Sequence, residues 1–420
     1  MPKALAAVLV VALVARIAVI VATPDFTPLF DAADFHRHAA SIAQGDGYPP
    51  PQLGTTGATA FRPPLYPVAL ALVQKLGGGH DAERLLGVLL GVATVLLTYL
   101  IAARLWGARA ALLAGAIAAV FPPLVFLSVS LLSELLFVPL ALASVLAVLR
   151  YRDDRRLRWA ALAGALCGLA VLTRTNGLPL VLALAAGVWV TRPWRSRAAL
   201  AAPAVVVLAA VLVLAPWVVR NAVVFDRFVG LGTGAGYALA GTYNAEARDR
   251  AQHPGEPFAP NVLRTYEDDL AKRGLDEAEL IGRLNDQATA YVRDHPGYVV
   301  ETMLWNVPRV FDLERRGEFE PTFAAQQVQA KGMGPIDSPV VFLGSLYVVL
   351  ALGIGGAAVV IRRRATPAFV WAAPVLLLLP ALAIYGLPRY RAPADPFLVM
   401  LAALSVAAAY ERLTASRARG

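Results

Sequence analysis

Residues 198–219 read AALAAPAVVVLAAVLVLAPWVV, a run without a single charged side chain. About 20 consecutive apolar residues are enough for a helix to cross the hydrocarbon core of a bilayer. Arg192, Arg195 and Arg197 lie directly before this run. Because short basic connections stay on the cytoplasmic side, the run predicts a transmembrane helix that begins in the cytoplasm and ends outside.

Similar runs recur along the chain, and hydrophobic residues make up 58% of it. The predicted spans are 4–22, 83–104, 108–127, 131–149, 159–173, 177–191, 198–219, 338–361, 367–385 and 396–411. The connections 150–158 and 362–366 are also basic. The sequence therefore predicts an all-α polytopic membrane protein of about ten transmembrane helices, with both termini inside.

This topology divides the chain into three units. An N-terminal transmembrane module, 1–219, contains a first outer loop at 23–82. A non-cytoplasmic region with amphipathic helices follows at 220–337, and a C-terminal transmembrane module spans 338–420. Within the first outer loop, residues 34–44 and 64–76 predict two short helices at the membrane interface. In the second outer region, Asp276 begins a helix with the spacing of a capping box.

The net charge of +9 does not indicate nucleic-acid binding, because the basic residues cluster beside the spans, as the positive-inside rule requires. Cys167 is the only cysteine, so a disulfide within the chain is excluded. Lys3 precedes the first apolar run and Arg16 interrupts it, which favours a retained membrane anchor over a cleaved signal peptide.

Carboxylates and histidines follow the first span directly. Asp31 or Asp34 could act as a general base at the membrane surface; a solvated loop acid or a helix N-cap is the alternative for Asp31. Asp34, His36 and His38 could also ligate a metal, but only Asp34 and His38 share a helical face and no third ligand is evident. No metal ligand is therefore assigned, and a divalent metal is left open as a cofactor.

Further ionisable residues lie at or near membrane depth, where a charge is costly and points to function. Glu134 is predicted at the outer end of the fourth span, where it either serves the site or reaches water. Arg16 and Arg174 either bind a lipid phosphate or extend to the interface. Arg389 and Arg391 lie between the last two spans on the outer face, where topology does not explain them; they form a lipid-phosphate clamp or pair with a loop acid.

An ordered set of motifs resembles the polytopic GT-C glycosyltransferases, in the superfamily of protein mannosyltransferases and aminoarabinose transferases (glycosyltransferase family 39-like). The motifs are Asp31-Ala-Ala-Asp34-Phe35, Gly45-Asp46-Gly47-Tyr48, Arg62-Pro63-Pro64-Leu65-Tyr66, Ser133-Glu134, Leu172-Thr173-Arg174, Pro216-Trp217, Gly236-Tyr237 and Arg389-Tyr390-Arg391-Ala392-Pro393. By this resemblance Asp31 matches the catalytic carboxylate of the first loop. Members with Asp-Glu carry a second acid next to it, whereas this chain has Ala32.

The resemblance implies transfer of a sugar from a polyprenyl-phosphate donor to an acceptor hydroxyl of an envelope glycan, lipid or protein, outside the bacterial plasma membrane. The expected catalytic residues are Asp31, Asp34 and Glu134. The expected substrate-binding residues are Arg16, Arg62, Tyr66, Arg174, Arg389, Tyr390 and Arg391. A transporter or flippase of lipid-linked sugars is the alternative, since it would use the same arginines without breaking a bond. An O-antigen ligase or polymerase is a further one, disfavoured by the early position of Asp31.

Overall fold

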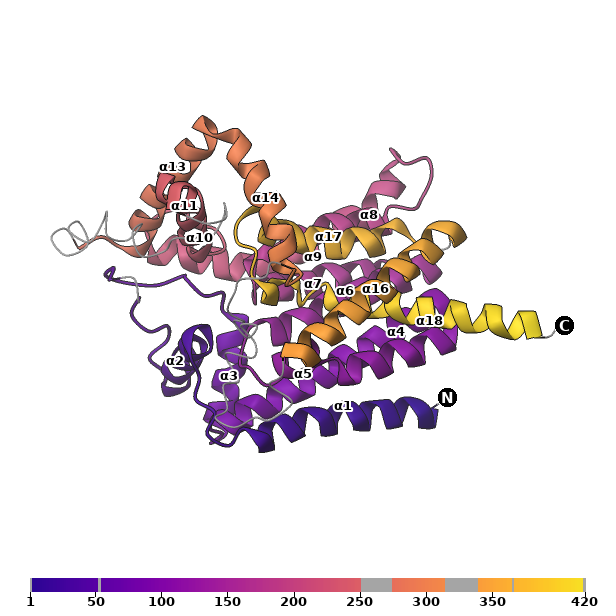
Figure 1. Ribbon diagram of the computed structural model, residues 1–420. Helices are drawn as coiled ribbons and strands as arrows, with labels where there is room; N and C mark the ends of the chain where they lie inside the picture. The colour runs from indigo at the N-terminus through magenta and orange to yellow at the C-terminus, as the bar shows by residue number, and fades with distance from the viewer. Residues whose placement is uncertain (1, 52–53, 251–273, 314–338, 365, 418–420) are drawn as a thin grey trace.

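The computed structural model describes residues 2–51, 54–250, 274–313, 339–364 and 366–417. Six helices in these ranges are long and apolar enough to cross a membrane (Figure 1). They are α1 (Pro2–Ala22), α4 (His80–Val120), α6 (Glu134–Asp154), α9 (Arg197–Val224), α16 (Pro339–Arg363) and α18 (Asp395–Arg417). Shorter apolar helices complete the bundle: α5 (Pro122–Leu127), α7 (Leu157–Val171), α8 (Leu180–Val188) and α17 (Ala368–Ala383). The protein is a multi-pass membrane protein.

The helices fall near the predicted spans, but those within the predicted spans 159–173, 177–191 and 367–385 are shorter than 18 residues. The predicted spans 83–104 and 108–127 are also not separated by a loop: α4 continues to Val120 through a kink at Gly107, and α5 follows it. Gly107 has φ 83°, a left-handed value that glycine adopts without strain. A single residue, instead of a loop, therefore connects the two helical halves of α4.

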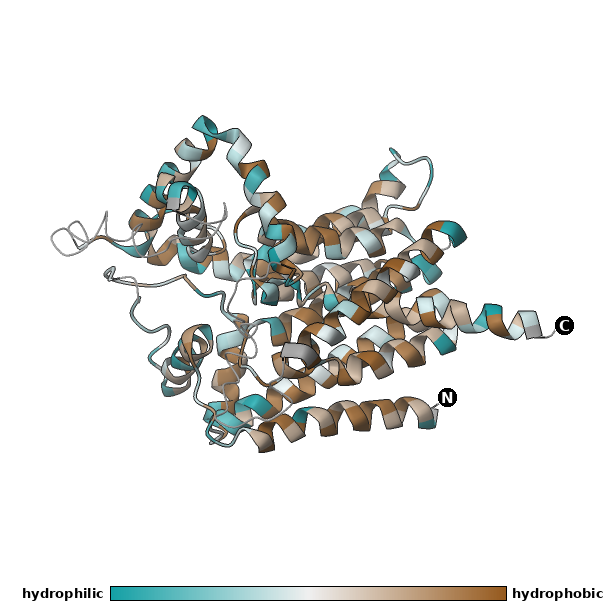
Figure 2. Ribbon diagram, in the orientation of Figure 1, coloured by the Kyte–Doolittle hydropathy of each residue, from teal (hydrophilic) through white to brown (hydrophobic). Residues whose placement is uncertain are grey.

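Small residues let the helices approach closely. Helix α7 packs against α6 and α9, and helix α16 packs against α18. A methyl group on Gly164 of α7 would lie 2.1 Å from the carbonyl oxygen of Val206 in α9, so no side chain fits there. Close contact between backbones is a usual basis of helix association in membranes, where lipid is as apolar as leucine. Hydrophobic residues predominate along the helices of the bundle (Figure 2).

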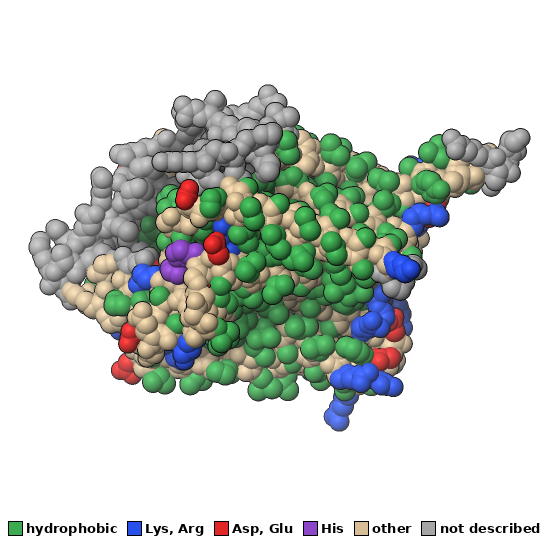
Figure 3. Space-filling view, turned by 90° about the horizontal axis from the view of Figure 1, so that it is seen from below, with side chains coloured by type: hydrophobic (Ala, Val, Ile, Leu, Met, Phe, Trp, Pro, Cys, Tyr) green, Lys and Arg blue, Asp and Glu red, His purple; other side chains and the backbone are tan. Residues whose placement is uncertain are grey.

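The two ends of the bundle differ in character. Both termini lie at the same end, while α2, α3, α10 and α13 lie at the opposite end (Figure 1). A broad apolar surface separates an end rich in lysine and arginine from an end where histidine and acidic side chains gather (Figure 3). This arrangement is the one that the predicted topology requires, with the first outer loop and the region after α9 on one side.

The helices of that second end support the candidate site. They are α2 (Phe30–Gln44), α3 (Leu65–Lys75), η1 (Thr175–Gly177), α10 (Gly234–Thr242), α11 (Ala245–Arg250), α13 (Glu277–Asp294), α14 (Pro296–Val310) and η3 (Pro388–Arg391). The predicted helix 34–44 begins earlier, at Phe30, which places Asp31 inside its first turn and not at its N-cap. Asp276 caps α13 as predicted, accepting a hydrogen bond of 2.7 Å from the backbone N–H of Glu279. Parts of the predicted region 220–337, at 251–273 and 314–338, lie outside the described residues.

Candidate active site

A cavity of about 390 Å³ opens at the end of the bundle opposite the two termini. Its wall combines α2, the loop before α3, the segment around η1, α10, the end of α17 and η3. The polar and charged residues on it are Asp31, Arg62, Ser133, Thr173, Arg174, Thr175, Asn176, Tyr237, Tyr385, Arg389 and Tyr390. Segments from the beginning, middle and end of the sequence therefore line the same cavity.

Asp31 is the carboxylate at this cavity. Its Oδ1 lies 2.6 Å from Nη2 of Arg62, and its Oδ2 lies 2.5 Å from Nη2 of Arg389. Burial alone would raise the pKa of Asp31, but the charges of Arg389 and Arg62 outweigh it and hold that pKa well below its usual range. Asp31 is thus an ionised carboxylate held between two guanidinium groups.

Asp34 lies one turn further along α2 and faces away from the cavity. Its Oδ2 accepts a 2.6 Å hydrogen bond from Nε of Arg62, and its Oδ1 accepts one of 3.0 Å from Nη2 of Arg37. Nδ1 of the buried His38 lies 3.2 Å from the same Oδ1. Burial raises the pKa of Asp34, yet His38 and Arg62 lower it further than burial raises it. Asp34 therefore holds Arg62 in place and is not among the residues that line the cavity.

Arg62 is the link between these two carboxylates. Its guanidinium lies over the rings of Phe35 and Phe61, 4.8 Å and 5.0 Å from their centroids. Cation–π contacts and paired hydrogen bonds fix the plane of a guanidinium group more firmly than they fix a lysine ammonium.

The position of Arg62 also decides whether Asp31 and Asp34 can share a metal ion. Arg62 occupies the space between Asp31 and Asp34, so these residues do not fit a divalent cation.

Two more arginines line the cavity from the other side. Nη1 of Arg174 lies 2.7 Å from Oε1 of Glu134, and Nε of Arg389 lies 3.9 Å from the same oxygen. Both guanidinium groups lie near the ring of Tyr390, at 5.1 Å and 4.9 Å from its centroid. Glu134 itself is buried behind them, at 1% exposure. It orients the two arginines from behind, one of the roles that the sequence left open for it.

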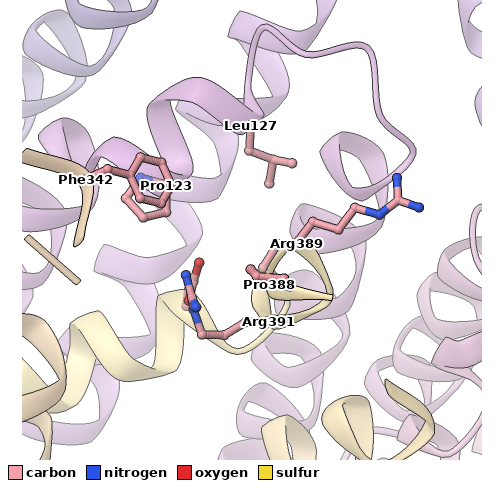
Figure 4. Close-up of a pocket in the computed structure, with 8 residues that line it drawn as sticks. Pro123, Leu127, Phe342, Pro388, Arg389 and Arg391 are labelled. Atoms are coloured by element: carbon pink, nitrogen blue, oxygen red, sulfur yellow. The ribbon is translucent and has the colours of Figure 1, made fainter. Parts of the chain in front are cut away.

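Three predicted substrate-binding residues do not line this cavity. Arg391 is buried, with Nε 2.8 Å from Asp395 Oδ1 and Nη1 3.2 Å from Asp312 Oδ2. Figure 4 shows the side chains of Arg389 and Arg391 leaving η3 in different directions, beside a pocket of only about 20 Å³. Of the two arginines in the predicted clamp, Arg389 lines the cavity, whereas Arg391 pairs with acids, the alternative that the sequence left open for it.

Arg16 and Tyr66 lie in the interior of the protein. Arg16 is fully buried, and its guanidinium donates to Ser128 Oγ at 2.9 Å and to the carbonyl oxygen of Ala119 at 3.0 Å. It ties α1 to α4 and α5 and neither binds at the cavity nor extends to the interface. Tyr66 is 1% exposed and packs edge-on against Phe35 at a centroid distance of 5.1 Å. Tyr66 therefore packs behind Phe35, which lines the cavity.

One position that supports the candidate site was missed by reasoning from the sequence. Glu277, at the first residue of α13, is fully buried and accepts hydrogen bonds from Thr59 Oγ1 at 2.6 Å, Ala60 N at 2.8 Å and Thr233 Oγ1 at 2.6 Å. It joins the region after α9 to the loop that carries Arg62. In the sequence, Glu277 is indistinguishable from an ordinary acid in the first turn of a helix.

Replacing Glu277 with glutamine is expected to destabilise the protein by about 1.5–3 kcal/mol, the usual contribution of hydrogen bonds to a charged group. The amide lacks the charge and turns a donor toward groups that themselves donate. The melting temperature of the purified protein in detergent reports the change. Glu279→Gln on the same helix is the matched control, because the side chain of Glu279 is 40% exposed and forms a surface pair with Arg283 at 2.9 Å. Equal melting temperatures for the two variants would contradict the docking role of Glu277.

Residues 61–219 match the family model described as dolichyl-phosphate-mannose-protein mannosyltransferase. The match includes Arg62, Glu134 and Arg174. No curated protein matches the chain.

Solved structures of the AglB oligosaccharyltransferase from Archaeoglobus fulgidus share the fold. The complex with an inhibitory peptide and a dolichol-phosphate has a TM-score of 0.55 and 16% identity, and the match covers 99% of this chain and 51% of that one. The apo form gives a TM-score of 0.55 at 16% identity, with the same coverage. ArnT from Cupriavidus metallidurans, bound to undecaprenyl phosphate, matches with a TM-score of 0.45 and 17% identity over 95% of this chain and 77% of that one.

The fold is that of the GT-C membrane glycosyltransferases. The family match and the AglB fold confirm the resemblance that the sequence motifs indicated. The chain spans about half the length of the AglB structures.

Proposed function

We propose that the protein is a glycosyltransferase of the bacterial plasma membrane that works on the outer face. It moves a sugar from a polyprenyl-phosphate-linked donor to an acceptor hydroxyl of a glycan, lipid or protein. The observation that carries this proposal is the meeting of one ionised carboxylate, Asp31, with three arginines, Arg62, Arg174 and Arg389, around one cavity at the end of the bundle opposite the basic connections.

The charges suit an inverting displacement. The acceptor hydroxyl loses its proton to Asp31 as its oxygen bonds to the anomeric carbon. The bond between that carbon and the phosphate oxygen breaks, and the electron pair leaves with the polyprenyl phosphate. Arg389 and Arg174 stabilise the negative charge that develops on this leaving group, since fixed cations in a partly dry site act strongly on such charge. Asp34 and Glu134 do not touch the substrate; they hold Arg62, Arg174 and Arg389.

The family and fold support a lipid-phosphate donor. The matching family is described by its dolichyl-phosphate-mannose donor, and one AglB structure contains a dolichol-phosphate. The cavity, at about 390 Å³, is near the lower end of the 300–1,000 Å³ typical of ligand pockets. That volume favours a donor with one or a few sugars over one that carries a long glycan.

A divalent metal at the catalytic carboxylate is not part of the proposal. One structure of the Archaeoglobus fulgidus oligosaccharyltransferase is a complex with zinc and sulfate. In this chain Ala32 follows Asp31, and Arg62 bridges Asp31 and Asp34. The positive charge that a metal would supply near the leaving phosphate is supplied by arginines.

The test is turnover of labelled donors by the purified protein in liposomes. A panel of polyprenyl-phosphate monosaccharides, each with a radiolabelled sugar, is offered together with a bacterial envelope extract as acceptor. We expect one donor to lose its label to the acceptor and to release free polyprenyl phosphate, at a rate well above that of protein-free liposomes. Movement of intact donor between leaflets, with no release of polyprenyl phosphate from any donor, would replace the proposal with that of a flippase.

A further inference from the structure

A second cluster of ionisable side chains lies beside the first, outside the cavity. His36 of α2 and His80 and Glu83 of α4 bring their ligand atoms within 4.8 Å of one another. His36 Nδ1 lies 2.9 Å from Glu83 Oε2, and His80 Nδ1 lies 3.6 Å from the same oxygen. The two imidazole rings stand side by side, with centroids 4.2 Å apart.

These separations suit ligands that share one metal ion. Zinc binds histidine nitrogen and carboxylate oxygen at about 2.0–2.2 Å with tetrahedral geometry, which places neighbouring ligand atoms about 3.3 Å apart. The two nitrogen-to-oxygen distances, 2.9 Å and 3.6 Å, lie on either side of that value. Two histidines and one glutamate are also a donor set that zinc takes in proteins, with a fourth position left for water.

Hydrogen bonding within the protein leaves this cluster incomplete. Glu83 is fully buried and accepts from His36 and from Gln74 Nε2, the latter at 2.6 Å. His80 Nδ1 is shielded from solvent and has no hydrogen-bond partner. A buried nitrogen without a partner is costly, and a metal ion would satisfy it. Gln74 meanwhile fixes the carboxylate as partners behind metal ligands commonly do.

The cluster is also accessible and well placed. The side chains of His36 and His80 are 30% and 41% exposed, so an ion can enter from the surface. Histidine side chains appear on this end of the molecule in Figure 3. His36 lies on α2, the helix that carries Asp31, whereas His80 and Glu83 begin the long helix α4. A metal here would tie the helix of the catalytic carboxylate to the membrane bundle.

We propose that His36, His80 and Glu83 form a binding site for one divalent transition-metal ion, of the zinc type, that fixes α2 against the start of α4. The inference does not depend on the proposed glycosyl transfer. It assigns the metal a structural role on α2 and leaves the arginine-lined cavity free of it.

The experiment uses the full-length protein with a purification tag that contains no histidine. After dialysis against EDTA, the protein is incubated with one equivalent of zinc, washed, and its metal content is measured by mass spectrometry. We expect about one zinc per chain, a higher melting temperature with zinc than with EDTA, and intense visible absorption when cobalt replaces zinc, as tetrahedral cobalt shows. His80→Ala should lose the bound ion, the melting shift and the cobalt spectrum together.

The choice of variants keeps the test decisive. His80 is partly exposed, so His80→Ala should fold; its melting temperature in EDTA verifies this. His295→Ala is the matched control, because His295 is half-buried just after α13 and its side chain contacts the carbonyl oxygen of Tyr291 and none of the proposed ligands. It should bind zinc like the wild-type protein. Zinc content near zero in the wild-type protein, or equal content in His80→Ala, would overturn the site and leave a hydrogen-bonded His36–Glu83 pair.

Discussion

Replacing Asp31 with asparagine is expected to lower the rate of sugar transfer by about 10²–10⁴-fold, the usual contribution of a general base. Asparagine has nearly the shape of aspartate but cannot accept the proton of the attacking hydroxyl. The loss should appear in kcat, whereas KM for the donor should change little, because Arg389 and Arg174 remain to bind phosphate. Single-turnover measurements with the labelled donor that the panel identifies separate chemistry from binding.

Asp46→Asn is the matched control for this variant. Asp46 is an exposed carboxylate just beyond the end of α2, so its loss should leave the rate within about twofold. Comparable losses in both variants would indicate a general effect of charge near the loop. An unchanged rate in Asp31→Asn would remove Asp31 from the mechanism.

Replacing Arg389 with glutamine is expected to lower the rate by about 10²–10³-fold, as does removal of one group that stabilises developing charge. A second effect follows from its contact with Asp31. The pKa of Asp31 lies below its usual range because Arg389 and Arg62 outweigh burial. Without Arg389 that pKa rises, so protonation of Asp31 begins at higher pH. The acid side of the pH–rate profile should therefore move to higher pH in Arg389→Gln.

The control for Arg389 is Arg363→Gln at the other end of the bundle. Arg363 is about half-exposed and pairs with Glu411 at 2.9 Å, so this change also removes a cation from an ion pair. It should alter neither the rate nor its pH dependence. A pH–rate profile for Arg389→Gln that coincides with the wild-type profile would show that Arg389 does not act on Asp31.

Much of the fold follows from the sequence because membrane insertion has few solutions. Apolar length sets the spans, and the basic connections set their direction. These two rules placed Asp31, Arg62 and Arg389 at the same end of the bundle, although they lie far apart in the chain. The contact of Asp31 with Arg389 in particular could not be predicted, because Arg37, Arg62 and Arg174 lie at the same end.

The placements that the sequence could not predict depend on the direction in which a side chain points. Arg389 and Arg391 are two residues apart, and in the tight turn of η3 they face different directions, one to the cavity and one to Asp395. Arg16 lies on a helix that is apolar on every side, so no polar face in the sequence indicates where it packs. The contact of His36 with Glu83 could not be predicted either, because the sequence does not show that α2 lies against the start of α4.

The pairing of Asp31 with Arg389 also has a consequence for biogenesis. The carboxylate is synthesised with the first outer loop, but its partner follows α17, near the end of the membrane domain. A nascent chain inserted only as far as α9 already displays Asp31, Arg62 and Arg174, yet it lacks η3 and the α17 wall of the cavity. Formation of the proposed active site is thus coupled to insertion of α17 and α18, and a chain inserted only as far as α9 lacks an enclosed cavity.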